Sequence, residues 1–392
     1  MSTGSEKLIQ ATDTYLMPNY GTRLLAAERG EGTRLWDADG KEYIDFFAGF
    51  GGAGVAGHCH PKVVEAVKRQ AETLWCHGNF FTSEPQVELA RKLTGHGFGG
   101  KAFFAHAGAD AVEAALKLAR LAAGDGRYKI ISFQGCFHGR TMGALSLTPE
   151  KYQQGFEPML PGNAKAEYGD LASVEALIDD ETAGVIVEPI QGEGGVRVPD
   201  AAFLPGLRKL CDERGLVLIC DEVWTGPART GKWFAHQHFG IEPDVMTVAK
   251  ALGGGAPLSV CIAAPKYQDV LGPGKHASTM GGNPLCVAAG LAAVELIEEE
   301  GLVARAAEKG ERITAALRDA DIGCIREVRG KGMMIGMELA VEAKPVFLEA
   351  MRRGLLVCIA QTHVLRIAPP LTTPDDALDQ GVDMLIDLLR GF

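Results

Sequence analysis

The segment from residue 245 to residue 255 decides the fold, and it reads Val245-Met-Thr-Val-Ala-Lys250-Ala-Leu-Gly-Gly-Gly255. Its first residues are a short run of apolar and β-branched side chains, which predicts a buried strand. A single lysine and a run of glycines follow, which predicts a turn. Lys250 is therefore expected at the carboxyl-terminal tip of a strand. In an open α/β sheet, this edge is where ligands bind.

A second strand-like run lies upstream and ends in carboxylates. The run is Leu216-Val-Leu-Ile-Cys220, and Asp221 and Glu222 follow it. A lysine amine can form a Schiff base with a carbonyl compound, and a carboxylate can hold the pyridinium nitrogen of pyridoxal phosphate. The two strand tips therefore predict a pyridoxal phosphate site, with Lys250 and Asp221 as its catalytic residues.

Strand-like and helix-like segments alternate through the middle of the chain. A helix is expected over residues 111–123, with Asp110 as its N-cap. Such alternation is typical of an α/β fold with a large, doubly wound and mainly parallel sheet. The further strands expected in this sheet are residues 101–105, 129–133, 184–187 and 259–263.

The two ends of the chain have a different pattern from its middle. Residues 33–45 predict a hairpin that turns at Asp39 and Gly40. Beyond about residue 295, acidic helical patterns alternate with two strand-like runs, residues 333–339 and 364–368. Both ends are therefore expected to fold together as one smaller α+β domain.

The expected domain boundaries follow from this contrast. Residues 1–50 and 291–392 would form the smaller domain, and residues 51–290 would form the large domain that binds the cofactor. A long helix from about Pro284 to Glu300 would connect the two domains. The smaller domain is expected to close over the larger one.

Composition and charge narrow the class of protein. The 392 residues include 39 Lys and Arg against 50 Asp and Glu, a net charge of −11 that disfavours nucleic acid or anionic membranes as partners. No apolar run could span a bilayer, and no secretory signal pattern is present at the amino terminus. Nine scattered cysteines without a C-x-x-C pair point to reduced thiols. We therefore expect a cytoplasmic enzyme that acts on small molecules.

Two segments that follow expected strands could bind anions or aromatic rings. In Ala107-Gly-Ala-Asp110, the backbone N–H groups at a helix start could hold a phosphate, or the glycine could only make a tight turn. In Phe137-His-Gly-Arg140-Thr, Phe137 or His138 could stack on a ring, and Arg140 could bind a carboxylate through two hydrogen bonds. The alternative for this pentapeptide is a surface loop.

Two further charged residues have unusual surroundings. Glu193 belongs to a glycine-rich loop, residues 188–195, that follows an expected strand, so it lies either at a substrate site or in a solvated loop. Arg366 interrupts the apolar run Val364-Leu-Arg-Ile-Ala368 and must face a partner or water. From the residues alone, an edge-strand charge is favoured over a carboxylate clamp.

Two motifs that suggest other chemistry are rejected. His58-Cys-His60 cannot easily converge on one metal ion without further ligands, and Pro61 favours a turn before a helix. Gly49-Phe-Gly-Gly-Ala-Gly54 matches a dinucleotide-binding pattern, but no helix is expected to open within it. We therefore expect neither a metal site nor a dinucleotide site.

In combination and in this order, the motifs resemble those of class III aminotransferases of pyridoxal-phosphate fold type I. The similarity is greatest to the branch that contains the acetylornithine and ornithine aminotransferases, enzymes of arginine biosynthesis and amino-acid metabolism. It extends over nearly the whole chain. The matching segments are residues 15–21, 57–61, 137–141, 188–195, 221–223, 229–231, 249–250, 278–284 and 329–332.

The resemblance implies roles for residues around the cofactor. Lys250 would hold pyridoxal phosphate as a Schiff base and move a proton between the substrate and the cofactor, and Asp221 would keep the pyridine nitrogen protonated. Thr279 would reach the phosphate from a partner subunit, which implies a homodimer. The other residues implied at the cofactor are Gly108 and Ala109 at the phosphate, Phe137 with its neighbour His138 and Val223 at the ring faces, Trp224, and Ser278.

The resemblance also implies two arginines that bind carboxylates. Arg140 would bind a substrate carboxylate, and Arg366 would bind the α-carboxylate of glutamate. Glu193 would pair with Arg366 when the amino donor needs no second clamp, because a lone arginine in a closed site is a costly unpaired charge. One pocket could then accept the amino donor and 2-oxoglutarate in turn.

Four features depart from the usual family pattern, one of which is that Pro227-Ala228 precedes Arg229-Thr-Gly231 in place of a glycine-rich pair. Ala107 stands where a serine hydroxyl would contact the phosphate, and Trp224 stands where a glutamine usually reaches the ring oxygen of the cofactor. An indole is larger than a glutamine side chain and donates a single hydrogen bond. The stretch from Gly49 to Gly57 is one residue longer than usual, in a loop expected near the substrate.

The expected activity is transfer of the terminal amino group of N-acetylornithine, or of a similar ω-amino acid, to 2-oxoglutarate. The products would be glutamate and a semialdehyde, formed by a ping-pong mechanism. Ornithine and 4-aminobutyrate are alternative donors. Two other classes of function stay open: a cofactor-binding protein of altered or low activity, and another pyridoxal-phosphate reaction such as aminomutase or decarboxylase chemistry.

Overall fold

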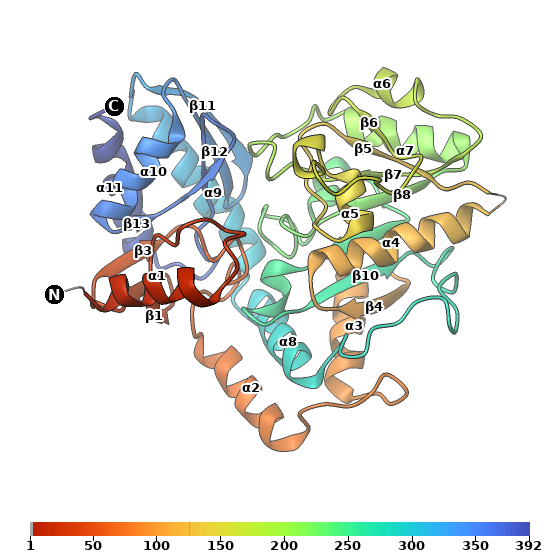
Figure 1. Cartoon of the computed structure of the whole chain (residues 1–392), viewed down its shortest axis with the longest axis horizontal. Helices are drawn as coiled ribbons and strands as arrows, with labels where there is room; N and C mark the ends of the chain where they lie inside the picture. Colours follow the sequence, from red (N-terminus) through yellow and green to blue (C-terminus); the bar gives the residue numbers. More distant parts are fainter. Residues whose placement is uncertain (1–2, 125) are drawn as a thin grey trace.

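The middle of the chain forms a seven-stranded sheet in the computed structural model, which describes residues 3–124 and 126–392 (Figure 1). The strand order is β4-β10-β9-β8-β7-β5-β6. Strands β5 to β9 are parallel, and β10 is antiparallel to both of its neighbours. The prediction of a large, mainly parallel sheet is therefore confirmed. The strands are β4 (Lys101–Ala105), β5 (Lys129–Phe133), β6 (Ala164–Ala166), β7 (Thr182–Val187), β8 (Val217–Asp221), β9 (Val245–Val248) and β10 (Ser259–Ala263).

Alternate residues of the strands pack against helices on opposite faces of this sheet. In β8, Ile219 belongs to the core beneath α4 (Gly108–Ala123), whereas Cys220 belongs to the core beneath α7 (Phe203–Arg214). This alternation follows from the two-residue period of a strand. Because helices cover both faces, the strands are continuous apolar runs, and the doubly wound arrangement is confirmed.

Helix α4 begins earlier than the sequence predicts. The expected N-cap, Asp110, is the third residue of the helix, and Ala107 occupies the cap position. The Asp110 carboxylate accepts a hydrogen bond of 2.9 Å from the backbone N–H of Ala107. This carboxylate therefore satisfies the N–H of the cap residue, whereas Ala107 has no side-chain oxygen to accept from the N–H groups of the first turn.

The two ends of the chain lie together on one side of the molecule, drawn in red and blue in Figure 1. They form two sheets, ordered β1-β2-β3-β13 and β11-β12-β15-β14. The predicted hairpin of β2 and β3 and the predicted pairing of β12 with β15 are both present. In the first sheet, β13 pairs in parallel with β3, so both ends share a sheet. The strands are β1 (Ala27–Glu31), β2 (Arg34–Asp37), β3 (Glu42–Asp45), β11 (Ile325–Lys331), β12 (Met334–Leu339), β13 (Leu355–Leu356), β14 (Cys358–Ala360) and β15 (Val364–Ile367).

The long helix α8 (Pro284–Glu299) leads from the large sheet to the carboxyl-terminal elements. The Asn283 side chain caps it by accepting from the backbone N–H of Leu285 at 2.9 Å, and Pro284 takes the first position, where a missing N–H costs little. Helix α8 packs against α2, α3 and α9, which explains why its own apolar residues are not confined to one face.

The remaining helices surround these sheets. They are α1 (Gly4–Tyr15), α2 (Pro61–Thr73), α3 (Glu84–His96), α5 (Met142–Leu147), α6 (Leu171–Glu175), α9 (Leu302–Asp319), α10 (Ala343–Arg353) and α11 (Asp375–Leu389), with short 3-10 turns η1 (Glu150–Tyr152), η2 (Ala235–Phe239) and η3 (Lys250–Gly253). Among the described residues, none of these helices combines the length and the apolar character that a membrane crossing requires.

Candidate active site

The tips of β8 and β9 lie side by side, because the two strands pair in parallel with Asp221 opposite Thr247. Asp221 ends β8, and Lys250 follows shortly after β9. Lys250 has a φ of +45°, a left-handed conformation that residues with a side chain rarely adopt and that often marks a functional site. The sheet thus brings the two residues of the predicted catalytic pair to one edge.

Lys250 lies in a small pocket at this edge. The walls of the pocket include Phe47, Phe50, Glu193, Trp224, Cys358 and Arg366. Burial lowers the pKa of the Lys250 amine from its ordinary value, although the nearby Asp221 carboxylate opposes the shift. A larger share of the amine is therefore uncharged, which is the form that attacks a carbonyl carbon.

Three groups hold the buried carboxylate of Asp221. Its Oδ2 lies 2.7 Å from Nδ1 of His138, and its Oδ1 accepts from the backbone N–H of Val223 at 3.0 Å and from the Thr247 hydroxyl at 3.2 Å. Burial alone would lower the pKa of His138, but Cys136 and the Asp221 carboxylate outweigh it and hold this pKa well above its ordinary value. His138 therefore donates a proton to the hydrogen bond and stabilises Asp221 as an anion.

Phe137 and Arg140 lie beside a residue that the sequence analysis did not identify, Tyr152. The Phe137 ring packs edge-on against Tyr152, with centroids 5.8 Å apart. The exposed Arg140 guanidinium lies 4.4 Å from the Tyr152 centroid and 5.3 Å from that of Phe137. Of the two rings that the sequence offered for stacking, that of His138 is engaged with Asp221, and that of Phe137 is partly exposed.

One buried carboxylate, Glu188, connects the loops that carry Phe137 and Glu193. Its Oε2 accepts from the backbone N–H of Phe137 and its Oε1 from that of Gly192, each at 3.1 Å. Burial raises the pKa of Glu188 to about 7. The sequence identified Glu188 only as the first residue of a loop, because its partner Phe137 comes from a distant segment.

Two glycines allow the start of α4 to approach the segment that follows β8 and the segment 137–140. A Cβ at Gly108 would lie 2.8 Å from Cγ1 of Val223, and a Cβ at Gly139 would lie 2.6 Å from Cβ of Ala109. Any side chain at either position would therefore push these segments apart. As built, the free N–H groups at the start of α4 lie next to the Asp221–Val223 segment and form a site for an anion.

Arg366 faces the pocket of Lys250, and its expected role as an edge-strand charge is wrong. Strand β15 lies between β12 and β14, and the Arg366 side chain is buried because β14 covers the outer side. Its Nη1 donates to Oε1 of Glu193 at 2.6 Å. Its Nη2 donates to the carbonyl oxygen of Ile359 at 3.1 Å and to Sγ of Cys358 at 3.0 Å. The pairing with Glu193 that the family resemblance implies is therefore present.

Cys358 was missed by the sequence analysis because β14 has only three residues and was not predicted. Cys358 is the direct cross-strand partner of Arg366, which brings the thiol to the guanidinium. Burial raises the pKa of this thiol even though Arg366 opposes the shift, so the sulfur accepts its hydrogen bond as a neutral group. A short hairpin leading into an interrupted apolar strand was the only sequence signal.

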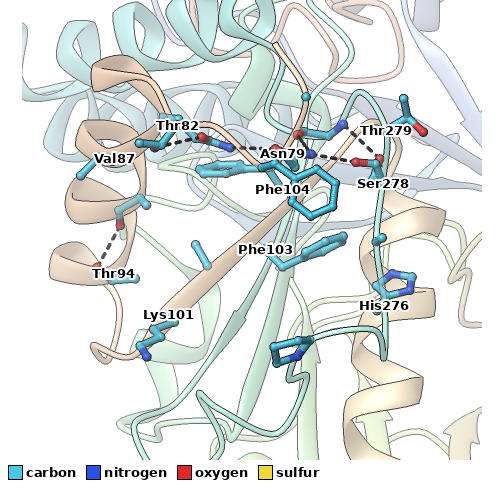
Figure 2. A pocket seen from close by; sticks show the side chains of 18 of the residues that line it. Asn79, Thr82, Val87, Thr94, Lys101, Phe103, Phe104, His276, Ser278 and Thr279 are labelled. Carbon is cyan, nitrogen blue, oxygen red and sulfur yellow. Dashed lines mark hydrogen bonds between the residues drawn. The ribbon is translucent and has the colours of Figure 1, made fainter.

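Ser278 and Thr279 line a different cavity (Figure 2). This cavity has a volume of about 1010 Å³ and lies between α3, β4 and the segment 273–281. Phe103 and Phe104 form part of its apolar wall. Neither Ser278 nor Thr279 lines the pocket of Lys250 within the part of the chain that the structure describes.

The two rejected motifs have structural roles. His58 lies 2.8 Å through Nε2 from Oδ2 of Asp45, and Nδ1 of His60 accepts from the backbone N–H of Lys62 at the start of α2. No helix opens within residues 49–54. That loop instead turns through four consecutive residues with positive φ, Ala48 to Gly51, beside Trp224.

The sequence is similar to characterised transaminases along nearly its full length. Residues 15–389 match the family model described as Aminotransferase class-III. An acetylornithine aminotransferase from Caldanaerobacter subterraneus subsp. tengcongensis is 43% identical over 383 residues, 96% of this chain and 97% of that protein. A succinylornithine transaminase from Salmonella paratyphi A is 43% identical over 382 residues, 95% of this chain and 93% of that protein.

Solved structures agree with the sequence comparison. An ornithine aminotransferase from Toxoplasma gondii superposes with a TM-score of 0.94 at 33% identity and covers 98% of this chain and 95% of its own. An acetylornithine aminotransferase from Elizabethkingia anophelis has a TM-score of 0.88 at 32% identity, with complete coverage of both chains. A match of this length, together with a lysine and an aspartate at adjacent strand tips, shows that the chain belongs to the class III aminotransferases.

Proposed function

We propose that this protein is a pyridoxal-phosphate-dependent aminotransferase that moves the terminal amino group of N-acetylornithine to 2-oxoglutarate. The observation that carries the proposal is the convergence of Lys250, Asp221 and the Arg366–Glu193 pair at one edge of the sheet. The similarity to relatives named acetylornithine aminotransferase and succinylornithine transaminase supports an N-acylated ornithine as the donor. Bound pyridoxal phosphate supplies the electron sink for the charge that develops on the substrate carbon.

The residues at this edge fit such a cofactor. The Asp221 carboxylate is held at the end of a strand by hydrogen bonds from His138 and Val223, and a carboxylate in this place could bind a pyridinium nitrogen. Gly108 leaves the start of α4 without a Cβ, so a phosphate can approach its N–H groups. The indole Nε1 of Trp224 is buried without a hydrogen-bond partner among the described residues, and such unpaired donors are rare unless a ligand completes them.

In this proposal each residue near the cofactor has one task. Lys250 would hold the cofactor through its amine and, when that amine is free, would move the proton at the substrate carbon. Asp221 holds the proton on the pyridinium nitrogen, and His138 keeps Asp221 anionic. Phe137 and Val223 enclose the ring, and Gly108 and Ala109 donate backbone N–H groups to the phosphate.

The two arginines divide the binding of carboxylates. Arg140 is exposed and stacks on Tyr152 and Phe137, so its donors can reach the carboxylate of the amino donor. Arg366 is held by Glu193 while the donor is bound and binds a carboxylate of glutamate or 2-oxoglutarate when Glu193 turns away. Since Glu193 is partly exposed and lies on a glycine-rich loop, it can move without disturbing the strand that carries Arg366.

A homodimer with shared active sites is part of this proposal. Large aromatic side chains are exposed at and near the cavity of Thr279, with Phe80 fully exposed and Phe81 and Trp75 mostly so. Clustered exposed aromatic residues are typical of a protein interface. A second copy that covers them would bring its own Ser278 and Thr279 to the phosphate site. The cytoplasm is the proposed location, which nine free cysteines among the described residues support.

The visible absorption spectrum of the holoenzyme tests the proposed reaction. N-acetylornithine added without an oxo acid should bleach the band of the bound cofactor, and 2-oxoglutarate should restore it. Ornithine and 4-aminobutyrate serve as control donors. If only these two bleach the band, the donor assignment is wrong, and a band that no amine bleaches would identify a protein of low activity. Turnover without any oxo acid would indicate aminomutase or decarboxylase chemistry.

A further inference from the structure

We propose that Trp224 is a positioning residue for the second substrate, because its indole holds the Arg366 guanidinium in place when Glu193 turns away. The inference rests on the proposed function, in which Arg366 binds a carboxylate of glutamate or 2-oxoglutarate. It concerns a residue that departs from the usual family pattern, in which a glutamine stands at this position.

The indole of Trp224 is fixed between two stretches of backbone. A Cβ at Gly192 would lie 2.5 Å from Cε3 of the indole, and a Cβ at Gly51 would lie 2.6 Å from its Nε1. Real Cβ atoms do not approach other atoms so closely, so only glycine leaves room for the indole at either position. The ring is therefore held on both sides and has little freedom to rotate within the pocket.

Two cations share this indole. Cζ of Arg366 lies 4.9 Å from the ring centroid, and Nζ of Lys250 lies 5.5 Å from it. Both distances are within the roughly 6 Å over which an aromatic ring attracts a cation, and tryptophan is the strongest of the aromatic partners. The glutamine usual in the family has no aromatic ring and could not provide this attraction.

Arg366 loses only one of its contacts when Glu193 is released. The carbonyl of Ile359 and the thiol of Cys358 both belong to β14, which is paired with β15, so these two acceptors stay with the strand. Both bind Nη2, whereas Nη1 is bound by Glu193 and the indole lies against the guanidinium carbon. The indole is thus the contact that keeps the guanidinium from swinging about its Nη2 bonds, and it offers partial compensation for a buried charge.

Loss of the indole should therefore weaken the binding of a dicarboxylate through Arg366. The probe is glutarate, which has the two carboxylates of 2-oxoglutarate but no oxo group and cannot react. Trp224→Gln should raise the dissociation constant of glutarate about tenfold, the size expected for a partly desolvated cation–π contact. Trp224→Phe keeps an aromatic face and should raise it far less.

A double-mutant cycle on the holoenzyme tests whether Trp224 acts through Arg366. Glutarate is titrated into the wild type, Trp224→Gln, Arg366→Ala and the double variant, and the shift of the cofactor absorption band gives each dissociation constant. In the Arg366→Ala background, Trp224→Gln should change glutarate affinity less than about twofold, because the residue through which it acts is gone. In the Trp224→Gln single variant, kcat/KM for 2-oxoglutarate should fall more than kcat/KM for the amino donor.

Each outcome decides between this inference and its alternatives. If Trp224→Gln lowers glutarate affinity tenfold both in the wild type and in the Arg366→Ala background, Trp224 contacts the ligand itself. If Trp224→Phe lowers glutarate affinity as much as Trp224→Gln does, the ring face is not responsible. If Arg366→Ala alone does not weaken the binding of glutarate, the proposed role of Arg366 is refuted, and the inference about Trp224 is refuted with it.

Two more variants test whether a loss of glutarate affinity comes from the displaced indole or from a general loss of structure. Gly192→Ala leaves Trp224 in the chain but displaces its indole, so it should reproduce the glutarate defect of Trp224→Gln. Trp36→Gln removes another indole that lies under a guanidinium, that of Arg29 at 3.5 Å, in the amino-terminal sheet. Glutarate affinity should be unchanged in this control, and a similar loss there would overturn the inference.

Discussion

Nδ1 of His138 lies 2.7 Å from Oδ2 of Asp221, and both side chains are buried. This pair gives the strand-tip carboxylate a buried hydrogen-bond donor. Because His138 follows β5 and Asp221 is the last residue of β8, the pair also ties the segment 137–140 to the tip of β8. Asp221 can therefore stay charged although it is removed from water.

Replacing His138 by Phe should lower kcat about 10- to 100-fold, because a hydrogen bond to a charged group is lost and the pyridinium proton is held less firmly. His138→Gln, which can still donate, should retain more activity. Steady-state rates per mole of bound cofactor give the comparison. The matched control is His236→Phe, which breaks a similar buried pair with Glu222 outside the pocket. Wild-type kcat in His138→Phe would contradict the role assigned to this pair.

Lys250→Ala should abolish both turnover and the visible band of the lysine-bound cofactor, because no other amine is expected to bond to the carbonyl carbon. Lys250→Arg provides a charge-matched control, since it keeps the cation above Trp224 but cannot form the bond. Absorption spectra and turnover assays measure both effects. Repeated turnover in either variant would rule out Lys250 as the bonding residue.

Arg366→Ala should reduce the rate of the glutamate half-reaction about 100-fold, because a charged hydrogen-bond donor to the α-carboxylate is removed. The half-reaction of the amino donor should be affected far less, since Glu193 occupies Arg366 at that stage. Stopped-flow absorbance with each substrate alone separates the two. Arg353→Ala removes a surface arginine from a pair with Glu349 and should change neither. Equal losses in both half-reactions would refute the exchange of partners.

Glu188→Gln should flatten the dependence of stability on pH. The raised pKa of Glu188, about 7 against 4.5 for the free side chain, means that the folded protein binds this proton more tightly than the unfolded chain. The contribution of Glu188 to stability is therefore fully present below about pH 4.5, and up to about 3 kcal/mol of it is lost as the pH rises to about 7. The test compares the drop in Tm between pH 5 and pH 8. An identical drop in the wild type and in Glu188→Gln would show that Glu188 is not the group responsible.

Phe80→Glu should convert the dimer to monomers, because it puts a charge into the exposed aromatic patch that a second copy is proposed to cover. Sedimentation or light scattering gives the mass, and cofactor content should fall with it if Thr279 of the second copy holds the phosphate. Phe392→Glu, at an exposed phenylalanine of the carboxyl terminus, is the control. An unchanged mass in Phe80→Glu would place the interface elsewhere.

Much of the large sheet could be predicted because local sequence is sufficient for it. A strand buried on both faces needs an unbroken apolar run, so Val245–Val248 and Val217–Asp221 could be recognised without knowing their neighbours. The strand tips also follow from such runs, which is why Lys250 and Asp221 could be named together. The start of α4 was misjudged because Asp110 can cap a helix from inside its first turn as well as from the cap position.

The residues around the central pair depend on contacts between distant segments. Arg366 looked like an edge charge because nothing in its own strand reveals that β14 lies beside it. Glu188, Tyr152 and Cys358 act through partners that are far away in sequence or on an unpredicted strand, so no local pattern identifies them. For the same reason, Trp224 could be recognised as an exception but not as the neighbour of two cations.

The sequence by itself determined the family, the parallel sheet and the lysine–aspartate pair, because these depend on the order of apolar runs and on the residues that end them. Only the tertiary structure decided which groups contact the charged side chains of the pocket. Arg366 binds Glu193, Asp221 is bound by His138, and the Trp224 ring lies against both Arg366 and Lys250. The physical reason is that burial along a strand is a local property with a fixed period, whereas the energy of a charge depends on every group within a few ångströms, from whatever part of the chain it comes.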